Sequence, residues 1–314
     1  MKQDPLTTPI LLLVFNRPET TKRVLAEVRK AKPTHLYVAA DGPRQNVAGE
    51  NERCEAARAA ATAIDWPCEV QTLFREKNLG CRSAVNSGLD WFFSKEEEGI
   101  ILEDDCLPDP SFFRFAGELL ARYRADDRVA MISGTNYLLD KLQIDSSYCF
   151  SRYFSVWGWS SWRRVWETHD KSMKQWQAVR STNWLGRLYR QGFMQRHMKK
   201  TFDLASSGAI DTWDIQFAFS CLLGGRVAVV PRVNLISNIG FTGTHTSGDR
   251  RNNDLPRFSL SDEPMSHPSA VQPDPRYDDV FFRREFGIHP TRWVAAMFAR
   301  VVHRFHRVLT GPGG

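Results

Sequence analysis

With 314 residues, 42% of them hydrophobic and 25% charged, the chain is long enough to bury a sizeable core, which excludes a disordered chain and a small disulfide-stapled domain. Its six cysteines are scattered without a Cys-x-x-Cys pair, so we expect reduced thiols and a cytoplasmic protein. The formal net charge of +6 is modest, and because the basic residues form no recognisable module we expect no nucleic-acid partner.

Short apolar runs alternate with helical periodicity through the first third of the chain. Runs typical of strands buried on both faces occupy residues 9–15, 35–40, 69–74 and 99–102. Helical spacing of apolar residues follows each of the first three, up to residue 30, around 50–64 and at 81–93. The alternation predicts an α/β fold built on a parallel sheet with right-handed crossovers.

The residues that follow the predicted strands are the first candidates for a site, because open α/β sheets bind ligands beyond the carboxyl ends of their strands. They are Asn16-Arg17, Asp41-Gly42, residues 78–82 and Glu103-Asp104-Asp105.

The fourth strand runs directly into three consecutive carboxylates, Glu103, Asp104 and Asp105. Like charges at the mouth of a sheet raise one another's pKa unless a cation neutralises them, so a divalent metal is the simplest explanation, with a solvated turn as the alternative. Oxygen ligands of this kind favour Mg²⁺ or Mn²⁺. Such sites often use one or two protein carboxylates and complete the shell with phosphates and waters, which fits a bound nucleotide diphosphate.

The strand with its acidic triplet, followed by Pro108 and Phe112-Phe113, resembles GT-A nucleotide-sugar glycosyltransferases. The resemblance is to the family of the N-acetylglucosaminyltransferase that starts complex N-glycan branching and to its bacterial relatives. It implies a GT-A (Rossmann-like) fold with a mixed, mostly parallel sheet flanked by helices. It also implies that Asp105 binds the metal and that Glu103 and Asp104 contact the donor, with UDP as the usual nucleotide.

Further residues fit the donor side of this resemblance. Asn78 and Gly80 look like the family's N-x-G turn, and the helix start that follows, with Arg82, offers amide donors and a fixed cation to a diphosphate. An ordinary glycine turn with a helix cap is the alternative.

Three earlier residues and one late histidine complete the expected donor and metal site. Asn16, Arg17 and Asp41 occupy places where GT-A folds hold the nucleoside, and the aspartate commonly reaches uracil or ribose. His245 corresponds to the late histidine that completes the metal or diphosphate site in several GT-A enzymes, whereas a lone histidine is more often structural.

The catalytic base is expected in the segment that begins at Asp211. An inverting transfer needs a carboxylate to take the proton of the acceptor hydroxyl. Trp213-Asp214 resembles the first two residues of the family's W-D-D-W segment, but Ile215 stands where the family has a second aspartate. The base is therefore Asp214 or Asp211, and a helix N-cap is the alternative role.

Tryptophans crowd the second half of the chain, which we expect to build the acceptor side. Trp157-Gly158 looks like the family's aromatic and glycine segment, which lies close to the donor sugar and the acceptor. Aromatic faces suit the apolar C–H surface of a sugar, whereas core packing is the alternative.

The expected domain organisation is a catalytic domain over residues 1–248 and a C-terminal extension over 249–314. The catalytic domain divides into a donor half, 1–138, and an acceptor half, 139–248. Residues 292–309 predict a basic amphipathic helix that either lies on an anionic inner membrane or docks on the domain. We see no secretion signal and no apolar run long enough to cross a bilayer.

Together these features predict a metal-dependent, inverting glycosyltransferase that moves a sugar from a nucleotide-sugar donor to a hydroxyl of a glycan or glycolipid, in bacterial surface polysaccharide synthesis. Two alternatives stay open: a sugar-nucleotide nucleotidyltransferase and a non-catalytic glycan-binding scaffold of the same fold. The oligomeric state is not determined by these patterns.

Overall fold

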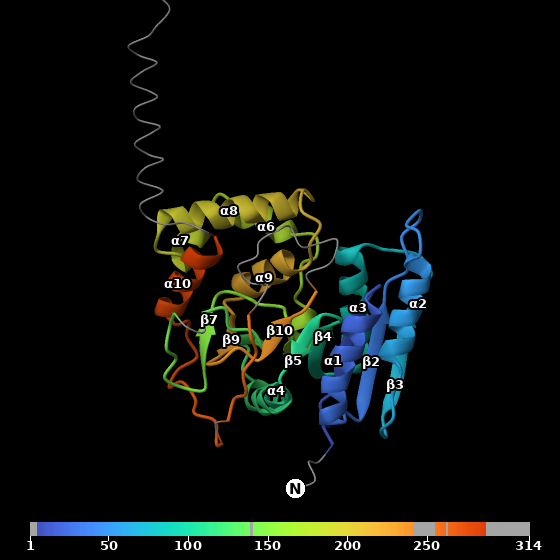
Figure 1. Cartoon of the computed structure of the whole chain (residues 1–314). Helices are drawn as coiled ribbons and strands as arrows, with labels where there is room; N and C mark the ends of the chain where they lie inside the picture. The colour runs from blue at the N-terminus through green and yellow to red at the C-terminus, as the bar shows by residue number, and fades with distance from the viewer. Residues whose placement is uncertain (1–4, 139–140, 241–254, 262, 287–314) are drawn as a thin grey trace, which may run out of the picture.

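A mixed sheet of eight strands forms the centre of the protein (Figure 1). The computed structural model describes residues 5–138, 141–240, 255–261 and 263–286. The strands lie in the order β3-β2-β1-β4-β8-β6-β9-β7. A separate pair joins β5 (Cys106–Pro108) to β10 (Ile236–Asn238) in antiparallel fashion.

The first half of the sheet is parallel. Its strands are β1 (Ile10–Val14), β2 (His35–Ala40), β3 (Glu69–Phe74) and β4 (Glu98–Glu103), with β1 between β2 and β4. All five residues of β1 are buried, which is why its sequence is an unbroken apolar run. The connections are α1 (Pro18–Ala31), α2 (Glu50–Ala61) and α3 (Cys81–Lys95). The carboxyl ends of these four strands therefore meet at one edge of the sheet.

The second half of the sheet is mixed. Its strands are β6 (Val129–Ser133), β7 (Tyr148–Ser151), β8 (Trp159–Trp162) and β9 (Val227–Pro231). β8 runs antiparallel to both β4 and β6, β9 is parallel to β6, and β7 is antiparallel to β9. The helices of this half are α4 (Pro110–Tyr123), α5 (Arg163–Trp166), α6 (Lys174–Val179), α7 (Trp184–Leu188), α8 (Gly192–Ser206), α9 (Asp214–Leu223) and α10 (Pro275–Glu285).

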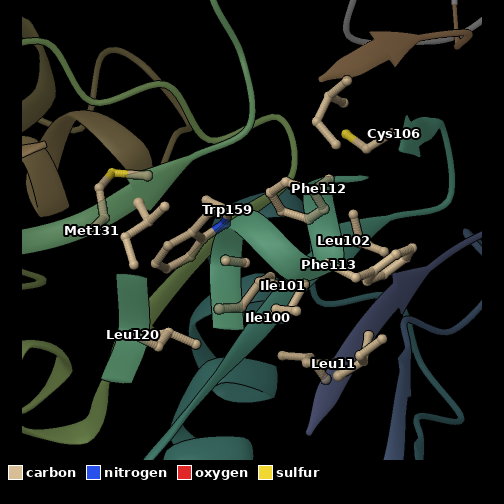
Figure 2. Packing of buried hydrophobic residues seen from close by; sticks show 14 of the residues in the cluster. Leu11, Ile100, Ile101, Leu102, Cys106, Phe112, Phe113, Leu120, Met131 and Trp159 are labelled. Carbon is tan, nitrogen blue, oxygen red and sulfur yellow. The ribbon is translucent and has the colours of Figure 1, made fainter. Parts of the chain in front are cut away.

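The main hydrophobic core lies along both faces of the sheet. Figure 2 shows Leu11 on one side of Ile100 and Ile101, and Trp159 on the other, so β4 sits at the centre of this cluster. A second cluster lies under α6 to α10 and includes the fully buried Trp176 and Phe202. This cluster accounts for part of the tryptophan-rich texture of the second half, because large aromatics bury much apolar surface.

The predicted fold class is confirmed: the protein is α/β, with a Rossmann-like mixed, mostly parallel sheet flanked by helices. The helix predicted around residues 50–64 is shorter than expected, since α2 ends at Ala61. Thr62 follows it, and the Thr62 hydroxyl donates to the carbonyl of Arg58 over 2.9 Å. Among the described residues, no helix combines the length and the apolarity that a membrane span needs.

The described part of the C-terminal extension packs on the acceptor half. Tyr277 and Phe282 of α10 are buried in the second cluster, and Asp278 accepts a 2.6 Å hydrogen bond from the hydroxyl of Ser151 in β7. The proposed boundary at residue 248 and the predicted helix over 292–309 lie outside the described residues.

Candidate functional site

The parallel pairing of β1 and β4 brings Arg17 beside the acidic triplet. The Nη1 atom of Arg17 lies 2.5 Å from Oδ2 of Asp105 and 3.3 Å from Oδ1 of Asp104. The backbone amide of Phe15 donates to Oδ2 of Asp104 over 3.0 Å. Both aspartates are buried, so one guanidinium partly neutralises two carboxylates that the sheet holds out of water.

The two aspartates differ in the oxygens that they leave free. Both carboxylate oxygens of Asp104 accept hydrogen bonds from nitrogen donors, whereas within the described residues Oδ1 of Asp105 accepts only from the Cys106 thiol, at 3.6 Å. The backbone of Asp105 is also fixed, since its carbonyl accepts from the amide of Ile239 over 2.8 Å. Gly240 packs so closely on the Asp105 carboxylate that any side chain there would collide with it. Asp105 is therefore held in place, and its Oδ1 has only this weak donor among the residues that the structure describes.

This donor set fits an Mg²⁺ or Mn²⁺ ion only if the ligand supplies most of the shell. Among the described residues, no three His, Cys, Asp or Glu side chains group as metal ligands. One hard carboxylate oxygen, with diphosphate and water as the remaining ligands, is compatible with such ions. The predicted late ligand His245 lies outside the described residues.

Glu103 has no hydrogen-bond partner for its carboxylate among the described residues, and it is partly buried at the end of β4. Burial raises its pKa, and the charges of Asp105, Asp104 and Asp214 raise it further, while Arg17 opposes the rise. Burial and the neighbouring Asp105 likewise raise the pKa of Asp104.

The start of α9 contributes to the charge around these acids. Asp214 is the first residue of α9, and its charge helps to raise the pKa of Glu103. The hydroxyl of Thr212 donates to the Asp214 carboxylate. Trp213 is buried and stacks on Trp159 of β8 with a ring-centroid distance of 5.7 Å, which anchors this turn to the sheet.

Asp211 lies against the turn that precedes α3. Its Oδ2 atom is 3.7 Å from the position that a Cβ would take on Gly80, whose φ of +78° suits glycine. The next residue, Cys81, was missed by sequence reasoning, although its place at a predicted helix start beside N-x-G was visible. Burial raises the pKa of the Cys81 thiol to about 12, and Glu103 and Asp211 contribute.

Several residues predicted to bind the donor make contacts within the protein. Asn16 donates to the buried Glu50 over 2.8 Å. Nη2 of Arg82 donates to the carbonyl of Lys171 over 2.6 Å, so this cation joins α3 to the segment before α6. Nδ2 of Asn78 donates to Oδ2 of Asp41 over 2.9 Å.

Trp157 and Gly158 lie before β8, near the second cluster. The Trp157 ring is partly buried and lies 5.5 Å from the ring of Tyr137. Gly158 is buried with a φ of +61°, and its Cα packs on the side chains of Ile236 and Leu102. Core packing thus accounts for Gly158, whereas part of Trp157 stays open to solvent.

A cleft of about 520 Å³ lies at the opposite edge of the sheet, near the amino ends of β1 and β4. Its charged lining includes Arg124, which forms an ion pair with Glu98 at 2.6 Å. The predicted site residues do not line this cleft, so we place the candidate site at the carboxyl edge with the acids.

Comparisons with known proteins give no family. No protein-family model and no curated protein matches the sequence. Among solved structures, the chain is similar to HddC from Yersinia pseudotuberculosis, with a TM-score of 0.32 and 7% identity over 52% of this chain and 80% of that one. It is also similar to a UDP-glucose pyrophosphorylase complexed with UDP-glucose, with a TM-score of 0.30 and 9% identity over 52% of this chain and 78% of that one. A third similar structure is the inositol-1-phosphate CTP transferase from T. maritima, with a TM-score of 0.31 and 11% identity over 52% of this chain and 74% of that one.

Likenesses at TM-scores of 0.30–0.32 do not establish a shared activity. The class that the fold itself defines is an α/β protein with a Rossmann-like sheet.

Proposed function

We propose that the protein is a metal-dependent, inverting glycosyltransferase that transfers a sugar from a nucleotide-diphosphate sugar, with UDP as the nucleotide, to an acceptor hydroxyl. One observation carries the proposal: Asp211 lies against the Gly80 turn before α3, and the charges of Glu103, Asp211 and Asp214 together raise the pKa of Cys81, the residue after that turn. A site with carboxylates on two sides can hold a metal and a diphosphate on one side and a base on the other.

We assign different roles to Asp104 and Asp105 because their hydrogen-bond partners differ. Among the described residues Oδ1 of Asp105 has only the weak Cys106 donor and suits a metal ligand, whereas Asp104 is held by Phe15 and Arg17 and acts on the donor through that pair. Arg17 adds a cation beside the expected diphosphate. A bound Mg²⁺ or Mn²⁺ supplies Lewis-acid stabilisation of the departing diphosphate.

Asp214 is the proposed base. Its carboxylate takes the proton of the acceptor hydroxyl as the hydroxyl oxygen attacks the anomeric carbon, and the bond from that carbon to the diphosphate oxygen breaks on the opposite face. The Thr212 hydroxyl orients the carboxylate by donating to it. Asp211 is the competing candidate because it lies on the other side of the turn at Gly80.

The wider setting is part of the same proposal. The partly exposed Trp157 offers an aromatic face to a sugar, so a glycan or glycolipid is the proposed acceptor. A bacterial role in surface polysaccharide synthesis, with contact to the inner membrane through residues 292–309, follows from the family resemblance and the basic sequence of that segment.

A sugar-nucleotide nucleotidyltransferase is the second candidate, because it would use the same sheet and metal carboxylates and because the matched structures carry names of that class. Such an enzyme is expected to have a glycine-rich basic loop after its first strand. The chain has Asn16-Arg17-Pro18 there, and Arg17 is already paired with Asp104 and Asp105.

The two candidates differ in the products that they release. The purified protein is incubated with Mn²⁺ and a panel of nucleotide sugars, and separately with nucleoside triphosphates and sugar 1-phosphates. Release of nucleoside diphosphate that is lost in Asp105→Asn and Asp214→Asn, but kept in the exposed control Asp65→Asn, supports the glycosyltransferase. Pyrophosphate release from a triphosphate supports the second candidate. Absence of both products, with glycan binding intact, points to the non-catalytic scaffold.

A further inference from the structure

The carboxylate of Asp41, at the end of β2, is occupied by contacts within the protein. Its Oδ1 accepts hydrogen bonds of 2.9 Å from the amide of Gly42 and of 2.9 Å from the amide of Leu79. Its Oδ2 accepts from Nδ2 of Asn78 over 2.9 Å and from the Leu79 amide over 3.2 Å. A carboxylate offers about four acceptor positions. Asp41 therefore has little capacity left for a nucleoside.

Further contacts reinforce this connection between the β2 end and the loop after β3. Nδ2 of Asn78 also donates to the carbonyl of Gly42 over 2.9 Å. Gly42 lies so close to the other loop that a Cβ would come within 2.6 Å of the backbone nitrogen of Lys77. Nη2 of Arg58 on α2 donates to the carbonyls of Asp41 and Arg75, at 3.3 and 2.5 Å, and so joins the ends of both strands.

The loop held in this way leads directly into the candidate site. Gly80 follows Leu79 and turns the chain at a φ of +78° into α3, which begins at Cys81. Asp211 lies against this turn, and the charges of Glu103 and Asp211 act on the Cys81 thiol. Displacement of Leu79 would therefore move the turn against which Asp211, one of the two candidate bases, lies.

We propose that Asp41 is a positioning residue: through Asn78 and Leu79 it fixes the Gly80-Cys81 turn against which Asp211 lies, and it does not bind the donor itself. Its effect on donor affinity rests on the proposed function. The connection to Leu79 and Asn78 does not, so the two can be tested separately.

The first test uses the full chain without ligand. Amide hydrogen exchange at Leu79, and the rate at which iodoacetamide labels Cys81 as followed by peptide mass spectrometry, are compared for native protein, Asp41→Ala, Asp41→Asn and Glu76→Ala. Glu76 is exposed in the loop after β3 that Asp41 contacts, so Glu76→Ala removes one carboxylate charge from that loop without breaking the connection. We expect at least tenfold faster Leu79 exchange and faster Cys81 labelling in Asp41→Ala. Asp41→Asn keeps an oxygen for the Leu79 amide and should restore most of the protection, and Glu76→Ala should match the native protein.

The second test is a double-mutant cycle on UDP affinity in the presence of Mn²⁺. If Asp41 acts through the loop, Asp41→Ala with Asn78→Ala loses no more affinity than Asp41→Ala alone, because the same connection is already broken. Losses that add in the double variant would show that Asp41 does not affect UDP affinity through its bond to Asn78, and would overturn the inference. Native exchange at Leu79 in Asp41→Ala would overturn it as well. Faster exchange in a protein that binds no UDP would uphold the connection and refute the proposed function instead.

Discussion

Arg82, in the first turn of α3, donates from Nη2 to the carbonyl oxygen of Lys171 in the acceptor half over 2.6 Å. Two further residues on the same face of α3 continue the contact. Asn86 Oδ1 lies 3.1 Å from Nε2 of His169, and Asp90 accepts from Nε1 of Trp166 over 2.9 Å. Spacing of four residues places all three side chains on one stripe of the helix. α3 therefore makes a row of polar contacts with residues 166–171, and the turn before it lies beside the candidate site.

The first prediction concerns the contact between Arg82 and Lys171. Arg82→Met keeps the apolar stem but removes the charged donor, so the carbonyl of Lys171 loses its partner. We expect the free energy of unfolding to fall by about 1–2 kcal/mol, as for other hydrogen bonds to charged groups. Urea unfolding measures the change, with the exposed Arg23→Met as control. Unchanged stability together with a large loss of diphosphate affinity would mean that Arg82 serves the ligand instead.

The second prediction concerns the cation between the buried acids. Arg17→Met leaves Asp104 and Asp105 facing each other without a counter-ion. Breaking a fully buried pair costs about 3–5 kcal/mol, and since the Arg17 side chain is 24% exposed we expect about 1–3 kcal/mol. Thermal unfolding checks this, and millimolar Mn²⁺ should restore part of the loss if Asp105 binds the ion. Arg29→Met breaks an exposed pair with Asp65 and should cost about 1 kcal/mol or less.

The third prediction separates steric collision from backbone strain. Gly158 and Gly208 both have positive φ, +61° and +75°. A Cβ on Gly158 would come within 2.5 Å of Ile236, whereas nothing lies within 4 Å of one on Gly208. Gly208→Ala should cost about 1 kcal/mol from strain alone, and Gly158→Ala about 2–4 kcal/mol because overpacking is added. Equal melting temperatures for the two variants would contradict the close packing at Gly158.

The fourth prediction concerns pH. The Arg44 side chain donates to the buried Glu50 carboxylate and lowers its pKa from 4.5 to about 2, against the opposing effect of burial. The folded state thus holds the carboxylate ionised where the unfolded chain takes up a proton. The stabilisation is complete above pH 4.5 and is lost as the pH falls toward 2.

Because Arg44 is 34% exposed, we expect a contribution of about 1–2 kcal/mol. Chemical unfolding of native protein and Glu50→Gln from pH 6 to pH 3 tests it: the stability difference between them should shrink as the medium becomes acidic. A difference that does not vary with pH would show that Glu50 is not ionised in the folded state.

The sequence by itself determined the strand and helix alternation and the edge where the site lies. An unbroken apolar strand such as Ile10–Val14 is stable only where both of its faces are buried. Polar residues that follow such strands then lie together at the carboxyl edge of the parallel sheet. The acids at residues 103–105 could be located in this way, whereas Asp214 was singled out only by the resemblance of Trp213-Asp214 to a W-D-D-W segment. These properties are local, so local patterns reveal them.

Only the tertiary structure decided which of the polar residues at that edge are used within the protein. Asp41, Asn78, Arg82 and Asn16 share the residue types of a binding site, yet each finds a partner on a segment distant in sequence. The number of hydrogen-bonding positions on a side chain is fixed by its chemistry, but which of them remain free depends on what the fold brings alongside. Asp104 takes the amide of Phe15 and Asp105 takes the guanidinium of Arg17, and both contacts exist only once β1 and β4 have paired.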